Sequence, residues 1–174
     1  AFKKARSIKP DSAEICNNMG NALKDQGKPE EAIKAYNKAL ALNPDYPEAW
    51  NNIGNCLEDK GMLAEAIQAY KKALSIKPDY ADAYNNMGNA LKEQEKLDKA
   101  IDSYKKAISI KPNYAEAWIN GAEALEKWNK LDQLGAWLNN AFNSLKKIPA
   151  DIRFMKSKLL WRHKRYDDTL SLMS

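Results

Sequence analysis

Apolar residues recur along most of this chain at the spacing of one face of an α-helix, in pairs of short segments. In residues 47–60, Trp50, Ile53 and Leu57 stand at i, i+3 and i+7, which is the spacing of an amphipathic helix. The same spacing returns in residues 63–76, at Ala66, Ile67, Tyr70, Ala73 and Leu74. The pattern therefore predicts two consecutive helices in this stretch.

This pair of helical patterns repeats with a period of 34 residues. Three regular blocks follow one another without a gap, at 13–46, 47–80 and 81–114, and the first and third agree at 18 of their 34 positions. The remaining parts are the end of an earlier repeat, a divergent repeat and a partial repeat, at 1–12, 115–149 and 150–174. Repetition of a helix pair at this period predicts one stacked array, in which each unit buries its apolar face on its neighbours.

Each block carries its own stop and start signals. Gly27 and Gly61 stand between the two helices of their blocks, where glycine adopts a left-handed turn without steric cost. The second helices are followed by prolines, which cannot continue them, at Pro44, Pro78 and Pro112. Asp45 precedes Glu48 by three residues, close to a capping box. The same spacing joins Asp11 to Glu14, Asp79 to Asp82 and Asn113 to Glu116.

Small residues within the helices predict close helix packing. A glycine stands in the middle of each first helix, at Gly20, Gly54 and Gly88, and a tyrosine in each second helix, at Tyr36, Tyr70 and Tyr104. Glycine costs about 0.5–1 kcal/mol in a helix, which favours a site of close approach. In the divergent repeat Gly121 is shifted by one position and Gly135 interrupts the second helix, so we expect a local change of superhelical rotation at 115–149. The last block permits a further helix pair with its turn at Arg165-Tyr166.

The repeated positions resemble the signature of the tetratricopeptide repeat, closely over 1–114 and loosely over 115–174. They are Trp50, Ile53-Gly54, Leu57, Ala66, Tyr70, Ala73 and Pro78, in a 34-residue period. The resemblance implies an all-α fold, a right-handed superhelix of stacked antiparallel helix pairs with the first helices on its concave side. It also implies a protein–protein interaction module whose partner is a protein or peptide.

Composition narrows the function classes. Charged residues make up 29% and hydrophobic residues 44% of the chain, and no apolar run is long enough to span a membrane. Two cysteines and a single histidine, His163, stand in no metal-ligand spacing. No nucleophile motif or phosphate-binding loop occurs either. We therefore predict a cytoplasmic protein that is not an enzyme, binds no cofactor or metal, and has neither a nucleic acid nor a membrane as its partner.

A polar stripe rich in asparagine follows the apolar stripe of each first helix. Asparagine is unfavourable within a helix because its side chain competes for backbone hydrogen bonds. An amide offers two donors and two acceptors, so a row of asparagines can pair with the backbone of an extended peptide. The candidate peptide-binding residues are Asn17, Asn18, Asn21, Lys24, Asn51, Asn52, Asn55, Glu58, Asn85, Asn86, Asn89, Lys92 and Asn120.

The recurrence of these asparagines is also compatible with two origins that involve no ligand. They can hydrogen-bond between neighbouring first helices, or simply recur because the repeat was duplicated. The stripe also resembles the repeat arm of O-linked N-acetylglucosamine transferases, a resemblance that implies contacts to substrate backbone from Asn18, Asn52, Asn86 and Asn120.

Alternative functions follow from the same sequence. The chain can be the substrate-presenting arm of a larger transferase, a sulfotransferase or glycosyltransferase whose catalytic domain lies outside residues 1–174. Uncapped helices at both ends of the array instead favour self-association into a homo-oligomer, and they lead us to expect a fragment of a longer protein. Lysines on the second helices, such as Lys71 and Lys105, fit a solvated convex face.

Overall fold

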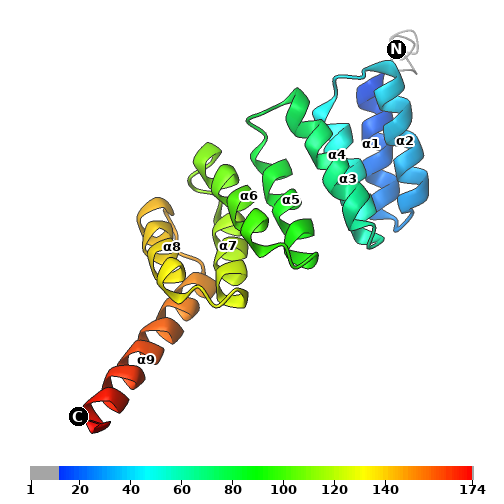
Figure 1. Ribbon diagram of the computed structural model, residues 1–174. Coiled ribbons are helices and arrows are strands. Elements are labelled where there is room, and N and C mark those ends of the chain that lie inside the picture. The colour runs from blue at the N-terminus through cyan, green and yellow to red at the C-terminus, as the bar shows by residue number, and fades with distance from the viewer. Residues whose placement is uncertain (1–11, 174) are drawn as a thin grey trace.

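The computed structural model describes the backbone of residues 12–173 and the side chains of residues 12–161. Of the partial repeat 1–12, only residue 12 is therefore described. The side chain of His163 lies outside the described part. Within it the backbone forms nine α-helices and no strand (Figure 1). The helices are α1 (Ala13–Asp25), α2 (Pro29–Leu42), α3 (Pro47–Asp59), α4 (Leu63–Ile76), α5 (Ala81–Glu93), α6 (Leu97–Ile110), α7 (Ala115–Lys127), α8 (Leu131–Ser144) and α9 (Ala150–Met173).

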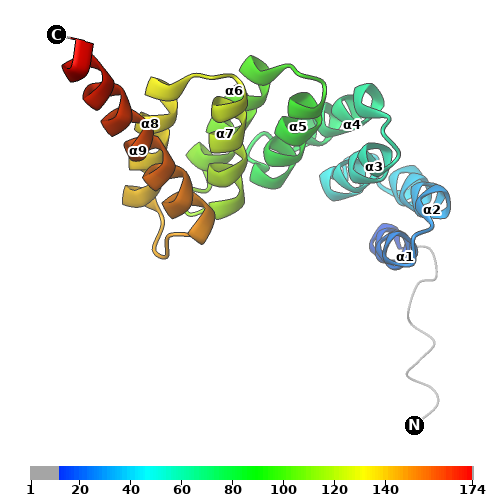
Figure 2. The ribbon, with the colours of Figure 1, turned by 90° about the horizontal axis from the view of Figure 1, so that it is seen from below.

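The helices stack as antiparallel pairs into a superhelix, which confirms the predicted fold class. The pairs are α1–α2, α3–α4, α5–α6 and α7–α8, and each second helix also packs on the first helix of the next pair. First helices of neighbouring pairs contact one another directly, whereas no second helix within residues 12–173 contacts the second helix of a neighbouring pair. The array therefore curves, with α1, α3, α5 and α7 on its inner face and α2, α4, α6 and α8 on its outer face (Figure 2).

The left-handed turn predicted between paired helices occurs at both glycines and also at two residues that are not glycine. Gly27 and Gly61 both have φ of 72°, in the left-handed region. Glu95 and Asn129 take the same conformation in the third and fourth pairs, with φ of 60° and 57°. The turn geometry is thus kept where glycine is absent, because packing of the two helices fixes it.

The capping boxes predicted at Asp45, Asp79 and Asn113 are wrong, and the one at Asp11 begins outside the described residues. Each first helix begins one residue later than an acidic N-cap requires, and the N-cap residues are Ser12, Tyr46, Tyr80 and Tyr114, none of which makes a side-chain cap hydrogen bond. The carbonyl of Tyr46 accepts the first intrahelical bond, from the backbone N–H of Trp50 at 3.3 Å. The tyrosine rings are half-buried, so the packing of the ring, not the acid before it, positions the helix start.

The mid-helix glycines make room for aromatic rings. A Cβ atom on Gly54 would lie 2.4 Å from Cε1 of Tyr70, and Gly20 and Gly88 face Tyr36 and Tyr104 at 2.4 and 2.5 Å. The close approach predicted for these glycines is therefore confirmed, with the ring of the paired second helix as the contact.

The divergent repeat keeps this arrangement in a shifted register. Gly121 faces the ring of Trp137, where a Cβ would lie 2.1 Å from Cζ2, so glycine and aromatic residue have both moved by one position. The expectation that Gly135 interrupts the second helix is wrong, since α8 runs through it without a break. A Cβ at Gly135 would lie 3.5 Å from Leu159 of α9.

The last block forms one helix and not the helix pair that its residues permit. α9 continues through Arg165-Tyr166 as 24 helical residues. Gly27, Gly61 and Asn129 mark the turns of other repeats, whereas no glycine, asparagine or proline occurs between 150 and 173. No following helix packs there within the described residues to impose a turn as it does at Glu95.

Candidate functional site

The asparagines of the inner face bond to one another from helix to helix. The Nδ2 of Asn52 in α3 donates to the Oδ1 atoms of Asn17 and Asn21 in α1, at 3.1 Å each. The next steps repeat this geometry between α3 and α5 and continue to α7. They run from Asn86 Nδ2 to Asn51 Oδ1 and Asn55 Oδ1, at 3.1 and 3.0 Å, and from Asn120 Nδ2 to Asn85 Oδ1, at 3.1 Å. We call these eight residues the asparagine ladder.

The buried tyrosines of the second helices reach the same row. The Tyr36 hydroxyl donates to Asn21 Oδ1 at 2.9 Å, and Tyr70 and Tyr104 donate in the same way to Asn55 and Asn89, at 2.9 and 2.8 Å. The sequence pattern by itself indicates no hydrogen bond for these tyrosines. The recurring spacing of 15 residues between asparagine and tyrosine is the signal that could have revealed the bond.

The candidate residues divide into a buried and an accessible set. Asn17, Asn51 and Asn85 are buried, with exposed fractions of 5%, 5% and 0%, and their hydrogen bonds join neighbouring first helices. Asn85 donates in addition to Glu116 Oε1 at 2.9 Å. Asn18 and Asn21 are exposed. Half-buried positions are held by Asn52, Asn55, Asn86, Asn89 and Asn120.

Several amide groups of the accessible set are left over by the ladder. Within the described residues, no hydrogen bond involves the Nδ2 atoms of Asn21, Asn55 and Asn89, or the Oδ1 atoms of Asn18, Asn52, Asn86 and Asn120. No buried side-chain N or O atom is unsatisfied in that part of the chain, so these atoms face solvent. The second and third repeats thus each offer one such donor and one such acceptor on the inner face.

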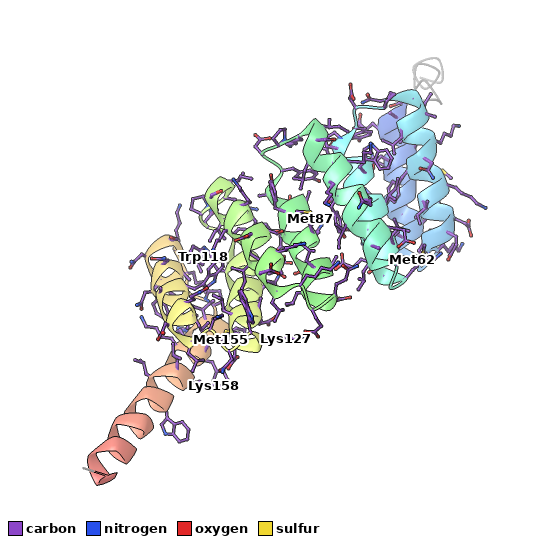
Figure 3. All side chains as sticks on the ribbon, in the orientation of Figure 1. Met62, Met87, Trp118, Lys127, Met155 and Lys158 are labelled. Atoms are coloured by element: carbon purple, nitrogen blue, oxygen red, sulfur yellow. The ribbon has the colours of Figure 1, made fainter. Side chains whose placement is uncertain are left out.

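The charged candidates pair with neighbouring repeats. Lys24 Nζ lies 3.9 Å from Asp59, and Lys92 Nζ lies 2.8 Å from Glu123. Two further cross-repeat pairs, Lys127–Glu95 at 2.6 Å and Lys158–Glu126 at 2.7 Å, continue toward α9, and both lysines are labelled in Figure 3.

The fold changes the acidity of Glu58. Its Oε2 lies 2.5 Å from the Tyr70 hydroxyl, whose single hydrogen is shared between this oxygen and Oδ1 of Asn55. Burial raises the pKa of Glu58 above its usual value, the negative charges of Glu93 and Asp59 add to this, and the bond from Tyr70 acts against it. A carboxylate in this place accepts a proton more readily than one in water.

Trp118 and Tyr80, two aromatic residues outside the stripe, pack within the array. Trp118 is 5% exposed, and its Nε1 donates to the carbonyl of Pro112 at 2.8 Å (Figure 3). Lys77 lies over the ring of Tyr80 at 5.0 Å, and burial raises the pKa of Tyr80 to about 12. Cys16 and Cys56 are buried and free, as expected for small core residues.

Neither a metal site nor a membrane span emerges from the described residues. They contain no group of three or more His, Cys, Asp or Glu side chains placed to hold a metal ion. Among them, too, no helix has the length and apolarity needed to cross a bilayer.

Comparison with known proteins agrees with this geometry. The family model for the tetratricopeptide repeat matches residues 17–81, and a second model of the same description matches residues 81–114. No curated protein sequence matches the chain. Two solved structures of MamA superpose with a TM-score of 0.71 each, at 29% and 28% identity, and cover 83% and 80% of this chain and 84% and 81% of theirs.

A third solved structure contains a bound peptide. It is the first TPR of Spaghetti (RPAP3) bound to the HSP90 peptide SRMEEVD, with a TM-score of 0.66 and 25% identity. The match covers 68% of this chain and 94% of that one.

Proposed function

From the premise that this chain belongs to the tetratricopeptide repeat family, we propose that its inner face binds an extended segment of a partner protein through the backbone of that segment. The chain is a protein-interaction module, and the proposal concerns where and how it binds. The asparagines of the inner face that retain unused amide groups would make the contacts.

The observation that carries the proposal is the repeated pair of unused amide groups. An Nδ2 donor and an Oδ1 acceptor recur in successive repeats, at Asn21 and Asn52 and again at Asn55 and Asn86. An extended peptide presents alternating N–H and C=O groups along each edge, so it can pair with such a row whatever its side chains are. The ladder fixes the rotamers of these amides before binding, which lowers the entropic cost of association.

A structural relative supports binding of a short peptide by this type of array. The RPAP3 TPR is bound to the peptide SRMEEVD in its solved structure. In the chain described here Lys24 and Lys92 pair with acids of the next repeat. The partner segment we propose is therefore held mainly by neutral amides, with polar or basic side chains accepted beside Glu58.

The test must spare the ladder, because alanine at Asn52 or Asn86 would also remove bonds between helices. In the variant Asn21→Asp/Asn55→Asp/Asn89→Asp each Oδ1 can still accept from its tyrosine hydroxyl, while the unused Nδ2 is replaced by oxygen and a negative charge is added. The matched control, Asn37→Asp/Asn139→Asp/Asn143→Asp, adds the same charge at exposed positions of the second helices. Binding of an array of extended peptides is measured for all three proteins.

We expect the wild type to bind many sequences weakly, the inner-face variant to lose roughly tenfold or more in affinity, and the control to bind as the wild type does. N-methylation at alternate residues of a bound peptide should weaken binding similarly, because it removes backbone donors. Equal binding by both variants, or no binding by the wild type, would contradict the proposal. A substrate-presenting arm of a transferase would use the same face and stays a prediction.

Self-association is the second candidate function, and exposed apolar side chains at the two ends of the array favour it. Ile15 and Met19 in α1 are 38% and 58% exposed, and Phe154 in α9 is 69% exposed. Contact between two such different faces would be heterologous and would grow with concentration. Sedimentation velocity should show larger species for the wild type and fewer for Met19→Lys/Phe154→Lys. A purely monomeric wild type would exclude this function.

A further inference from the structure

The outer face of the array is grooved where neighbouring second helices separate. The backbones of successive first helices approach one another closely, while those of the second helices α4 and α6 lie farther apart. Helix α5 packs on both α4 and α6 and lies between them in the array (Figure 2). The side chains that face outward there form the floor of a groove that runs along α5, on the opposite side of the array from the asparagine ladder.

The floor of this groove is apolar. Tyr84, Met87 and Leu91 stand at i, i+3 and i+7 of α5 and line two adjoining hollows, with volumes of about 510 and 350 Å³, that share Asp102 and Ser103 of α6 as a wall. Tyr84 and Met87 are half-buried, so each keeps apolar surface in contact with water. Met87 is labelled in Figure 3 on α5. We name this the α5 groove.

The walls of the α5 groove are basic. Its lining lysines are Lys71, Lys96, Lys99, Lys105 and Lys106. Asp102 is the only acid among the lining residues, and it lies 3.4 Å from Lys105. Lys96 donates to Gln94. Among the described side chains nothing pairs with Lys71, Lys99 or Lys106.

The lysines of this groove recur only in part in the other repeats. The positions that match Lys99 in the other pairs are Glu31, Glu65 and Gln133, whereas those that match Lys106 are Lys38, Lys72 and Asn140. The ring of Trp50 stands where Tyr84 stands in the preceding pair. A repeat that had merely been copied would carry the same charge at each of these positions.

We infer that the α5 groove binds an acidic segment of a partner protein, with aspartate or glutamate against the lysines and an apolar side chain on Met87 and Tyr84. Charge complementarity selects the occupant, because unpaired lysines on both walls attract carboxylates and repel basic chains. The floor is mostly aliphatic, and no arginine lines the walls. A nucleic acid would instead favour stacked aromatic rings and the bidentate phosphate contacts of arginine.

The probe is a fluorescein-labelled peptide with leucines at i, i+3 and i+7 and glutamates between them. The control peptide is the same sequence with every Glu replaced by Gln. Anisotropy is measured on the full chain, on Lys71→Glu/Lys99→Glu/Lys106→Glu, and on a matched control. The control Lys28→Glu/Lys146→Glu/Lys147→Glu makes the same change of net charge at exposed positions in turns and loops. All six lysines are exposed, so folding should be unaffected, and circular dichroism verifies it.

We expect the groove variant to bind the acidic peptide at least roughly tenfold more weakly than the wild type, and the control to differ by less than about threefold. The Gln peptide should bind weakly to every protein, and added salt should weaken binding of the acidic one. In the wild type the methyl signal of Met87 should shift on titration while that of Met19 stays. The inner-face aspartate variant should bind the acidic peptide as the wild type does, which separates this site from the proposed function.

Equal affinities of the groove variant and the control, or an unmoved Met87 signal, would overturn the inference. The inference would also be overturned if the wild type bound single-stranded polyuridylate more tightly than the acidic peptide and the groove variant no longer bound polyuridylate. The groove would then be a nucleic-acid site. The inference would likewise be overturned if the acidic peptide did not bind the wild type.

Discussion

At the scale of the residue, the absence of a Cβ atom at Gly54 allows the hydrogen-bonded row of the inner face to form. Gly54 leaves the space that the ring of Tyr70 fills, and the ring carries its hydroxyl to Asn55. Asn55 then accepts from Asn86 of the next repeat. A glycine that looks unfavourable for its helix therefore holds the hydrogen-bonded row in place.

Substitution of Gly54 by alanine should destabilise the chain by about 2–3 kcal/mol, because the new Cβ would displace a ring buried on all sides. Gly61→Ala is the comparison, since a Cβ there has open space and only the left-handed backbone is strained, at about 1 kcal/mol. Denaturant unfolding followed by circular dichroism measures both. A smaller loss for Gly54→Ala than for Gly61→Ala would contradict this account.

Glu58 should make stability depend on pH. Its raised pKa means that the folded chain binds the proton more tightly than the unfolded chain. Between the ordinary and the raised pKa the folded state therefore holds more protons, and the free energy of unfolding falls as pH rises through that interval. Glu58→Gln should remove this contribution, so the stability of the variant relative to the wild type should increase from pH 4.5 to neutral pH. Glu65→Gln, at an exposed position of α4, serves as the control, and a parallel change in both variants would refute the assignment.

At the scale of the element, helix lengths are set by turns that do not all carry the favoured residue. Gly27 and Gly61 suit the left-handed position between paired helices, whereas Glu95 occupies it with φ of 60°. The packing of α5 on α6 compensates for the strain. Where no partner helix exists within the described residues, as after residue 163, the chain continues as one helix.

Replacing Glu95 by glycine should therefore stabilise the chain by about 1 kcal/mol, since a left-handed residue with a Cβ costs about 1–2 kcal/mol. The lost ion pair to Lys127 is exposed and offsets less than about 0.5 kcal/mol of this gain. Gln94→Gly is the control, because Gln94 has φ of −76° and gains nothing from glycine. Thermal and denaturant unfolding distinguish the two, and an equal effect of both substitutions would disprove relief of strain.

At the scale of the whole molecule, the asparagine ladder couples the repeats. Its bonds join α1 to α3, α3 to α5 and α5 to α7 along the inner face. In an array where each repeat contacts only its neighbours, such contacts determine how cooperatively the chain unfolds. The same row that we propose for peptide binding thus also stabilises the curvature.

Asn52→Ala should cost about 1–2 kcal/mol, because it removes two hydrogen bonds and leaves Asn17 without a donor. Asn18→Ala removes an exposed amide that bonds to no other described residue, and the better helix propensity of alanine should make it neutral or stabilising by about 0.5 kcal/mol. Equilibrium unfolding of both variants tests the ladder, and similar stabilities would show that it contributes nothing.

Most of the fold could be predicted from the sequence, and only part of the site. Pairs of helices, their period and two of their turns follow from local signals such as Gly61 and Pro78. The helix starts were misjudged because Asp45 has favourable capping chemistry locally, while Tyr46 is fixed by packing on neighbouring helices. The stripe itself was located, but whether Asn52 points to a ligand or to Asn17 depends on a helix 35 residues away.

The sequence by itself determined the repeat, because helix periodicity and chain-breaking residues act over a few positions. Only the tertiary structure decided which amides bond to each other, that Glu95 adopts a glycine-like turn, and that the lysines of α4 and α6 border one groove over α5. These features depend on the distance and rotation between stacked helices. Those quantities arise from the packing of buried side chains such as Tyr70 and Trp137, which no single helix contains.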